Sequence, residues 1–182
     1  VSVPGTVHGW ETALNQYGRM TLREVLKPAI DYALNGFPVS EVIAHFWSSE
    51  DTITKLNHRP SGKELLPGSA SNGGPKYGEI VKLPELGRTL QIIAEGGSEA
   101  FYKGEIAKKT AAFIQSEGGW LTEKDLAIHK SDWDEAISTN YRGVDIWECP
   151  PNGQGIAALI ALNLAEGYDI GSMGAQSADR YH

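Results

Sequence analysis

The sequence predicts an α+β protein that is predominantly α-helical and has one short β-hairpin. Along most of the chain, apolar residues recur at intervals of three and four, which is the spacing of one face of a helix. Strict alternation of apolar and polar residues occurs only in two neighbouring runs late in the sequence. With 182 residues, 41% of them hydrophobic, the chain can bury the core of one domain or of a large part of one.

The first clear helix begins after Thr21. Thr21 and Glu24 have the spacing of a capping box, in which each residue binds the backbone of the other. An apolar stripe follows as far as Leu34, and Asn35-Gly36 is typical of the left-handed end of a helix. We expect a kink at Pro28, because its ring removes a backbone donor and crowds the carbonyl of Glu24.

Several further helices are predicted from their first residues. Ser40 is placed to cap a helix that runs to roughly Asn57, and Pro84 fits the first turn of another. Between them, the many proline and glycine residues of positions 58–78 predict a long surface loop.

The next helical stripe runs from Ile106 to Ile114 and stops at Gly118-Gly119. Thr122 and Asp125 then predict the cap of a short helix.

The two alternating runs, residues 136–140 and 144–149, predict a hairpin with Tyr141-Arg142-Gly143 as its turn. Residues 156–166 have the composition of an apolar, alanine-rich helix closed by Gly167. The residues between this hairpin and this helix are the most conspicuous candidate site, which we call the glycine loop: Pro150, Pro151, Asn152, Gly153, Gln154 and Gly155.

The glycine loop allows two interpretations. Gly153 to Ala158 matches the G-x-G-x-x-A pattern of dinucleotide-binding folds, after a strand and before a helix. Against this, Val144 and Ile146 alternate with Asp145 and Trp147, unlike a strand that is buried on both faces. The simpler hypothesis is that the glycines allow a sharp reversal and close packing of the helix.

Composition argues against several classes of function. A net charge of -7 and the lack of clustered Lys and Arg disfavour a nucleic-acid groove or an anionic membrane surface. No apolar run approaches the roughly 20 residues that span a bilayer.

Cys149 is the single cysteine, so no internal disulfide is expected, and we interpret it as a packed residue rather than a nucleophile. We expect no metal site and no cofactor, because the histidines are scattered without a ligand motif: His8, His45, His58, His129 and His182.

A series of motifs in order along the chain resembles the large subunit of the γ-glutamyltranspeptidase family. Together the motifs extend over nearly the whole sequence, so they are far more specific as a set than any one of them. They are Val3-Pro4-Gly5-Thr6-Val7-His8-Gly9-Trp10, Leu26-Lys27-Pro28-Ala29-Ile30, Ala33-Leu34-Asn35-Gly36-Phe37, Ala100-Phe101-Tyr102-Lys103-Gly104, Gly118-Gly119-Trp120-Leu121-Thr122, Asp125-Leu126-Ala127, Tyr141-Arg142-Gly143 and Pro150-Pro151.

The resemblance implies an N-terminal nucleophile hydrolase, a precursor that cleaves itself into two subunits around an αββα sandwich. Residues 1–182 would be a single partial domain, an internal and mainly helical segment of the large subunit. In the family, a threonine at the new N-terminus of the small subunit attacks a γ-glutamyl amide such as glutathione, and water or an amino acid takes the acyl group. We therefore expect no catalytic and no substrate-binding residue within this segment, and an inactive fragment.

The resemblance also sets expectations for partners, location and alternatives. The partners would be the remaining large-subunit segments and the small subunit, with self-association of the isolated chain as a further expectation. A periplasmic or extracellular location is implied, with a cytoplasmic one left open. Because Asn152, Gly153 and Gln154 stand where the family often has serines, an acylase acting on glutaryl or poly-γ-glutamyl amides is the first alternative. A noncatalytic helical binding module is the second.

Overall fold

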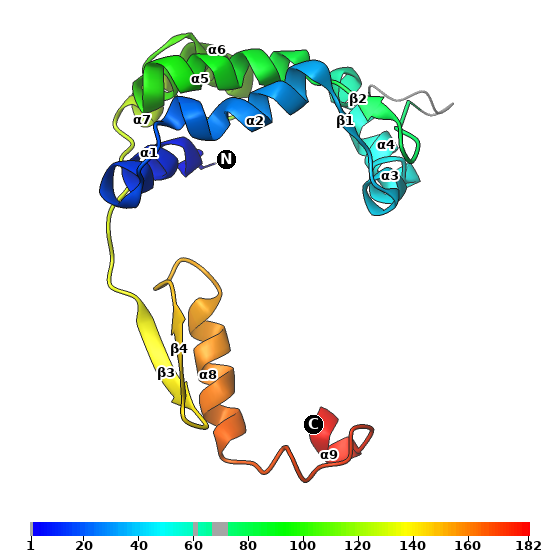
Figure 1. The fold of residues 1–182 in the computed structure, drawn as a ribbon, viewed down its shortest axis with the longest axis vertical. Coiled ribbons are helices and arrows are strands. Elements are labelled where there is room, and N and C mark those ends of the chain that lie inside the picture. Colours follow the sequence, from blue (N-terminus) through cyan, green and yellow to red (C-terminus); the bar gives the residue numbers. More distant parts are fainter. Residues whose placement is uncertain (1, 60–61, 67–72) are drawn as a thin grey trace. The chain divides into compact units, whose positions relative to one another are not determined.

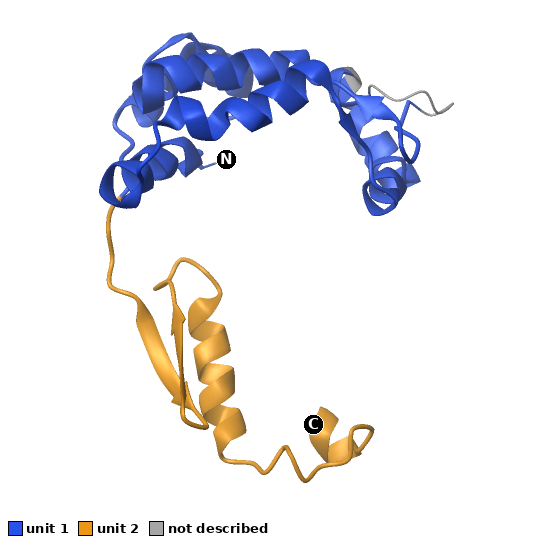
Figure 2. Cartoon of the chain, in the orientation of Figure 1, with its two compact units in different colours: residues 1–131 blue, residues 132–182 orange. Residues whose placement is uncertain are grey.

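The computed structural model describes residues 2–59, 62–66 and 73–182, which belong to two compact units (Figures 1 and 2). Unit 1 is residues 1–131, and unit 2 is residues 132–182. That all 182 residues form a single partial domain stays a prediction. The elements of unit 1 are α1 (Thr6–Tyr17), α2 (Leu22–Asn35), β1 (Phe37–Pro38), α3 (Glu41–Trp47), α4 (Glu50–Asn57), the 3-10 helix η1 (Gly62–Leu65), β2 (Ile80–Val81), α5 (Pro84–Tyr102), α6 (Glu105–Ser116) and α7 (Glu123–Ala127).

Unit 1 is built around the long packing of α2 against α5, which lie side by side in Figure 1. Helices α1, α6 and α7 complete this arrangement by packing on α5. A smaller cluster of Val39, Ala44 and Val81 lies beside the paired strands β1 and β2. The main core consists of Val7, Leu26, Ile93, Tyr102, Ala107, Ala111, Leu121 and Leu126.

The capping box predicted at Thr21 and the helix cap predicted at Thr122 are both confirmed. The Oγ1 of Thr21 accepts a hydrogen bond from the Glu24 amide at 3.3 Å, and the Glu24 carboxylate accepts one from the Thr21 amide at 2.7 Å. Thr122 and Asp125 make the same pair of bonds at the start of α7. The hydrogen bonds from Thr21 also hold the pKa of Glu24 below its usual value. Helix α2 ends at Asn35 and is followed by Gly36 as its C-cap, whose φ of 103° is in the left-handed region. The expected kink at Pro28 stays a prediction.

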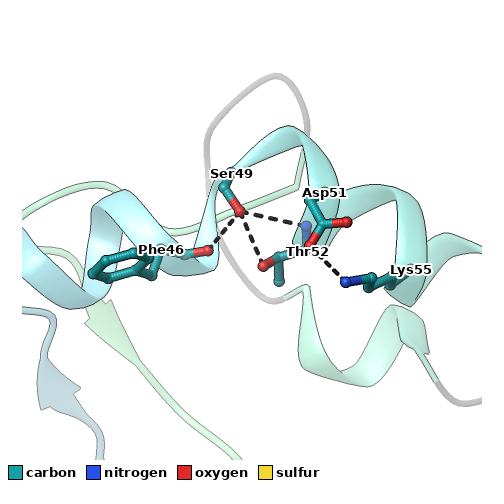
Figure 3. Close-up of polar contacts among 5 residues, drawn as sticks. All are labelled: Phe46, Ser49, Asp51, Thr52 and Lys55. Carbon is teal, nitrogen blue, oxygen red and sulfur yellow. Dashed lines mark hydrogen bonds and ion pairs between the residues drawn. The ribbon is translucent and has the colours of Figure 1, made fainter. Parts of the chain in front are cut away.

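The prediction of one helix from Ser40 to roughly Asn57 is wrong. Ser40 does cap a helix, but α3 ends at Trp47 and α4 begins at Glu50. Figure 3 shows the reason: the Ser49 hydroxyl bonds the Phe46 carbonyl at 2.9 Å and accepts from the Thr52 amide at 3.4 Å. A serine that binds the neighbouring backbone in this way favours a cap over a helix interior.

Two further differences from the predictions concern short or weakly marked elements. No strand was expected before the hairpin, yet β1 and β2 pair antiparallel with Phe37 opposite Val81. Strands of two residues are too short to show alternation, so the sequence carries no signal for them. Within the predicted loop over 58–78, residues 60–61 and 67–72 lie outside the described residues, and the described part contains η1.

Unit 2 contains the predicted hairpin, formed by β3 (Ile137–Tyr141) and β4 (Val144–Glu148), followed by α8 (Gly155–Glu166) and α9 (Ala178–Tyr181). Arg142 and Gly143 form the turn, with φ of 51° and 82°. Positive φ at both central residues is the mark of a type I′ turn, which matches the twist of a hairpin. Helix α8 covers the strand face that carries Thr139, whose hydroxyl hydrogen-bonds Asn163.

Helix α8 is apolar around most of its circumference but is covered on one side only. Within it Leu159 is buried, whereas Ile156, Ile160 and Leu164 are 40%, 52% and 68% exposed. These three positions are four residues apart and therefore form one stripe along the helix. Trp147, 64% exposed, lies on the opposite face of the hairpin from Thr139. A helix that is apolar all round is typical of one buried inside a larger protein.

The core of unit 1 makes a direct prediction about stability. Leu126 is fully buried in the main core, so Leu126→Ala should lower the free energy of unfolding by about 2–5 kcal/mol. Ile128, two residues further on, is 69% exposed, and Ile128→Ala should change stability by about 0.5 kcal/mol or less. Urea unfolding of both variants measures the difference, and equal losses would contradict the assignment of the core.

Candidate functional site

The glycine loop, the candidate site from the sequence, joins the end of β4 to the start of α8. At Gly155, the first residue of α8, an added Cβ would lie 2.6 Å from the Cβ of Glu148 and 3.0 Å from the Cys149 carbonyl oxygen. The helix therefore starts directly against the end of the strand, and a side chain at Gly155 would force them apart. Gly153 has nothing within 4 Å of the corresponding position, so its surroundings are open.

The surroundings of Gly155 weigh against the dinucleotide interpretation. The Oε2 of Glu148 lies 2.9 Å from the position of that added Cβ, so a carboxylate is next to the first turn of α8. A carboxylate beside the first turn of a helix repels a phosphate that approaches the same turn. The geometry supports the packing hypothesis for Gly155. That Pro150 to Gly155 form a binding site stays a prediction.

A second group of polar side chains, which sequence reasoning did not bring together, lies at the end of α5. The ring of Tyr102 is 6.2 Å from that of His8 and 5.0 Å from that of His129, and the two histidine rings are 5.9 Å apart. The Tyr102 hydroxyl donates to the Pro4 carbonyl at 2.6 Å and accepts from the His8 amide at 3.3 Å. We call Tyr102, His8 and His129 the anchor cluster, because it attaches the start of the chain to α5.

The Nδ1 atom of His8 already has hydrogen-bond partners. It accepts a hydrogen bond from the Ser131 amide at 3.0 Å, and the hydroxyls of Ser131 and Thr12 lie 3.0 Å and 3.1 Å from the same atom. A ring nitrogen has one lone pair, and a backbone amide can only donate. The Nδ1 atom of His8 is therefore not available as a base for either hydroxyl, so these contacts do not form a nucleophile and base pair.

A cavity of about 100 Å³ lies beside the anchor cluster, lined by Glu99 and Lys103 as well as by the three rings. Ligand pockets are typically about 300–1,000 Å³, so this space suits water rather than a substrate. The Nε2 of His129 is buried there without a hydrogen-bond partner among the described residues. The described residues also hold no group of three or more His, Cys, Asp or Glu placed for a metal ion.

A larger groove, about 300 Å³, lies between α2 and α5. Its floor includes Ile30 and Ala94, and Arg23, Lys27 and Glu95 line it with charges of both signs. No serine, threonine or cysteine lines this groove. The groove therefore lacks a hydroxyl or thiol nucleophile, and no residue in it was singled out from the sequence.

Comparison with known proteins resolves the family. The sequence matches the Gamma-glutamyltranspeptidase family over residues 1–182. This chain belongs to that family. The resemblance inferred from the ordered motifs is thereby confirmed, and so is the mainly helical fold with a short hairpin.

Relatives and solved structures agree with this assignment. The chain is similar to the glutathione hydrolase-like YwrD proenzyme of Bacillus subtilis (strain 168), with 37% identity over 100% of this chain and 34% of the relative. Its fold is similar to that of Helicobacter pylori γ-glutamyltranspeptidase, with a TM-score of 0.88, 28% identity, and coverage of 99% of this chain and 51% of that one.

The structure of a cephalosporin acylase from Bacillus halodurans is also similar, with a TM-score of 0.85, 37% identity, and coverage of 100% of this chain and 34% of that one. The chain spans about a third of the length of the curated relatives it matches. Among the described residues, no helix is both long and apolar enough to cross a membrane.

The glycine loop offers a matched pair of substitutions. Gly155→Ala should lower the free energy of unfolding by about 1–3 kcal/mol, because the new methyl group would overlap Glu148 and the Cys149 carbonyl. Gly153→Ala meets open space and should be close to neutral. Thermal or urea unfolding compares the two, and a larger loss for Gly153→Ala would show that the loop is packed differently.

The anchor cluster predicts a dependence of stability on alkaline pH. Burial raises the pKa of Tyr102 above its ordinary value, and the hydrogen bond from the His8 amide offsets part of this rise. The unfolded chain, in which tyrosine titrates near pH 10, therefore loses the proton first. The stability that Tyr102 contributes is present below about pH 10 and is lost as the pH rises further.

Unfolding free energies measured from pH 8 to 11.5 test this prediction. Tyr102→Phe should be less stable at pH 8, because two hydrogen bonds are lost, and should have a shallower alkaline decline than the unsubstituted protein. Tyr77, 74% exposed, provides the control, since Tyr77→Phe should leave the decline unchanged. An unchanged slope in Tyr102→Phe would refute this role of its hydroxyl.

Proposed function

We propose that the whole protein is a γ-glutamyl transferase or hydrolase, and that residues 1–182 supply scaffold for a site built by other segments. It cleaves γ-glutamyl amides such as glutathione and passes the acyl group to water or to an amino acid. The observation that carries this proposal is the family match over all of residues 1–182, together with relatives that are named glutathione hydrolase proenzymes.

The chemistry implied by the family divides one acyl transfer into two steps. A threonine hydroxyl, deprotonated by its own α-amino group, attacks the γ-carbonyl, and the amine leaves with a proton as the acyl-enzyme forms. Water or an acceptor amine then attacks the ester and restores the threonine. Both tetrahedral intermediates require hydrogen-bond donors for the oxyanion. Because the Nδ1 of His8 already accepts a hydrogen bond from the Ser131 amide, we assign this chemistry to residues outside the anchor cluster.

The partners we propose are the remaining large-subunit segments and the small subunit of the same precursor. The support comes from unit 2, where the stripe of Ile156, Ile160 and Leu164 and the side chain of Trp147 are exposed. Apolar surface of this kind is typical of an interface. An isolated chain of residues 1–182 should therefore self-associate, and light scattering that gives a monodisperse 19.7 kDa species would contradict this.

Release of p-nitroaniline from γ-glutamyl-p-nitroanilide tests the activity. The whole protein should release it, and glycylglycine should accelerate the release if the enzyme transfers the acyl group as well as hydrolysing it. An isolated chain of residues 1–182 should show no release above background. Turnover by that isolated chain would overturn the assignment of residues 1–182 to the scaffold.

An acylase is the second candidate function. It is supported by the similarity to the cephalosporin acylase structure and by Asn152, Gly153 and Gln154 in the glycine loop. A glutaryl group lacks the α-amino group of a γ-glutamyl group, so an acylase need not recognise that ammonium. Hydrolysis of glutaryl-p-nitroanilide by the whole protein, without hydrolysis of the γ-glutamyl compound, would favour the acylase.

A further inference from the structure

We propose that His8 is a pH-sensitive clasp, which in its neutral form holds the backbone of Ser131 against α1 and which releases it when the ring gains a proton. The clasp is independent of γ-glutamyl chemistry. It joins residues that are 123 positions apart, and Ser131 is the last residue of unit 1.

The tautomer of His8 follows from its partner. The Ser131 amide lies 3.0 Å from Nδ1 and, like every backbone N–H, can only donate. Nδ1 must then carry a lone pair, so the proton of the neutral ring is on Nε2. The hydroxyls of Thr12 and Ser131, at 3.1 Å and 3.0 Å from Nδ1, adapt to either form of the ring because a hydroxyl both donates and accepts.

Protonation turns this bond into a repulsive contact. The imidazolium has an N–H at both ring nitrogens, so the Nδ1–H would face the N–H of Ser131. The hydroxyls can rotate to accept from Nδ1, but the amide cannot. Ser131 must therefore move away, while the His8 backbone stays bonded to the Tyr102 hydroxyl.

Titratable and charged groups approach His8 from three parts of unit 1. On α5, Tyr102 presents a ring 6.2 Å away, and Glu99 and Lys103, an ion pair of opposite charges, line the adjoining cavity. On the segment after α7, the His129 ring is 5.9 Å from that of His8. On α1 itself, the Glu11 carboxylate is bonded by the amide and hydroxyl of Ser98, and Lys130 and Asp132 flank Ser131 in sequence.

The consequence concerns the point at which the chain leaves unit 1. After Ser131, residues 132–136 have no helix or strand before β3 begins at Ile137. At neutral pH the clasp fixes the start of this connecting segment. In acid the Ser131 amide loses its hydrogen bond to His8, so Ser131 joins the connecting segment that is free of helix and strand. The core of unit 1 is unchanged.

Amide hydrogen exchange at Ser131 in the whole protein, followed by NMR, tests the clasp. Protection factors, which correct for the intrinsic effect of pH on exchange, are compared at pH 7.5 and 5.0. The factor for Ser131 should fall by about threefold to tenfold, the worth of one net hydrogen bond. An unchanged factor would overturn the proposal.

Three substitutions test whether the acid response of Ser131 arises from His8 or from another histidine. His8→Asn places an amide oxygen, which does not titrate, near the position of Nδ1 and should keep Ser131 protected at both pH values. His129→Gln and His45→Gln should retain the acid response. A full acid response in His8→Asn, or its loss in His129→Gln, would assign the effect to another group.

The unsubstituted protein gives an independent reading if His8→Asn does not fold. The ¹⁵N chemical shifts of the His8 ring at pH 7.5 should show an unprotonated Nδ1 and a protonated Nε2. The titration of these shifts should follow the same midpoint as the shift of the Ser131 amide. A protonated Nδ1 at pH 7.5, or two separate midpoints, would refute the clasp.

Discussion

The structure of unit 1 depends on the buried hydroxyl of Tyr102. This side chain is 3% exposed at the end of α5, so its hydroxyl needs hydrogen-bond partners inside the protein. It finds them 98 and 94 residues away, in the Pro4 carbonyl and the His8 amide. The start of the chain is thereby fixed to α5, which also packs against α2.

Close contacts at two glycines then bring separate elements together. In α5, Gly97 has a φ of 64° and interrupts the helix, so the amide and hydroxyl of Ser98 reach Glu11 on α1. At Gly155, the missing side chain lets α8 begin against the end of β4. Both positions serve packing, which agrees with the scaffold role proposed for residues 1–182.

The two units differ in how far they bury their own apolar surface. Unit 1 has a main core that draws on α1, α2, α5, α6 and α7. In unit 2, α8 is apolar almost all round, yet Leu159 is its buried residue and the stripe of Ile156, Ile160 and Leu164 is exposed. Burial of that stripe requires contact with protein outside unit 2.

The sequence by itself determined the elements whose signals are local, and the family. Thr21 with Glu24, Thr122 with Asp125, and the Arg142-Gly143 turn each act over three residues or fewer, so they could be recognised without the fold. Only the tertiary structure decided the β1–β2 pair, the break at Ser49, the meeting of His8, Tyr102 and His129, and the carboxylate beside Gly155. The break depended on whether Ser49 lies inside a helix or caps the next one, and a serine can do either. The β1–β2 pair and the ring cluster join residues that are far apart in the chain. The carboxylate beside Gly155 depends on how closely the strand and the helix approach. Neither a long-range contact nor a distance between two elements can be read from residue spacing.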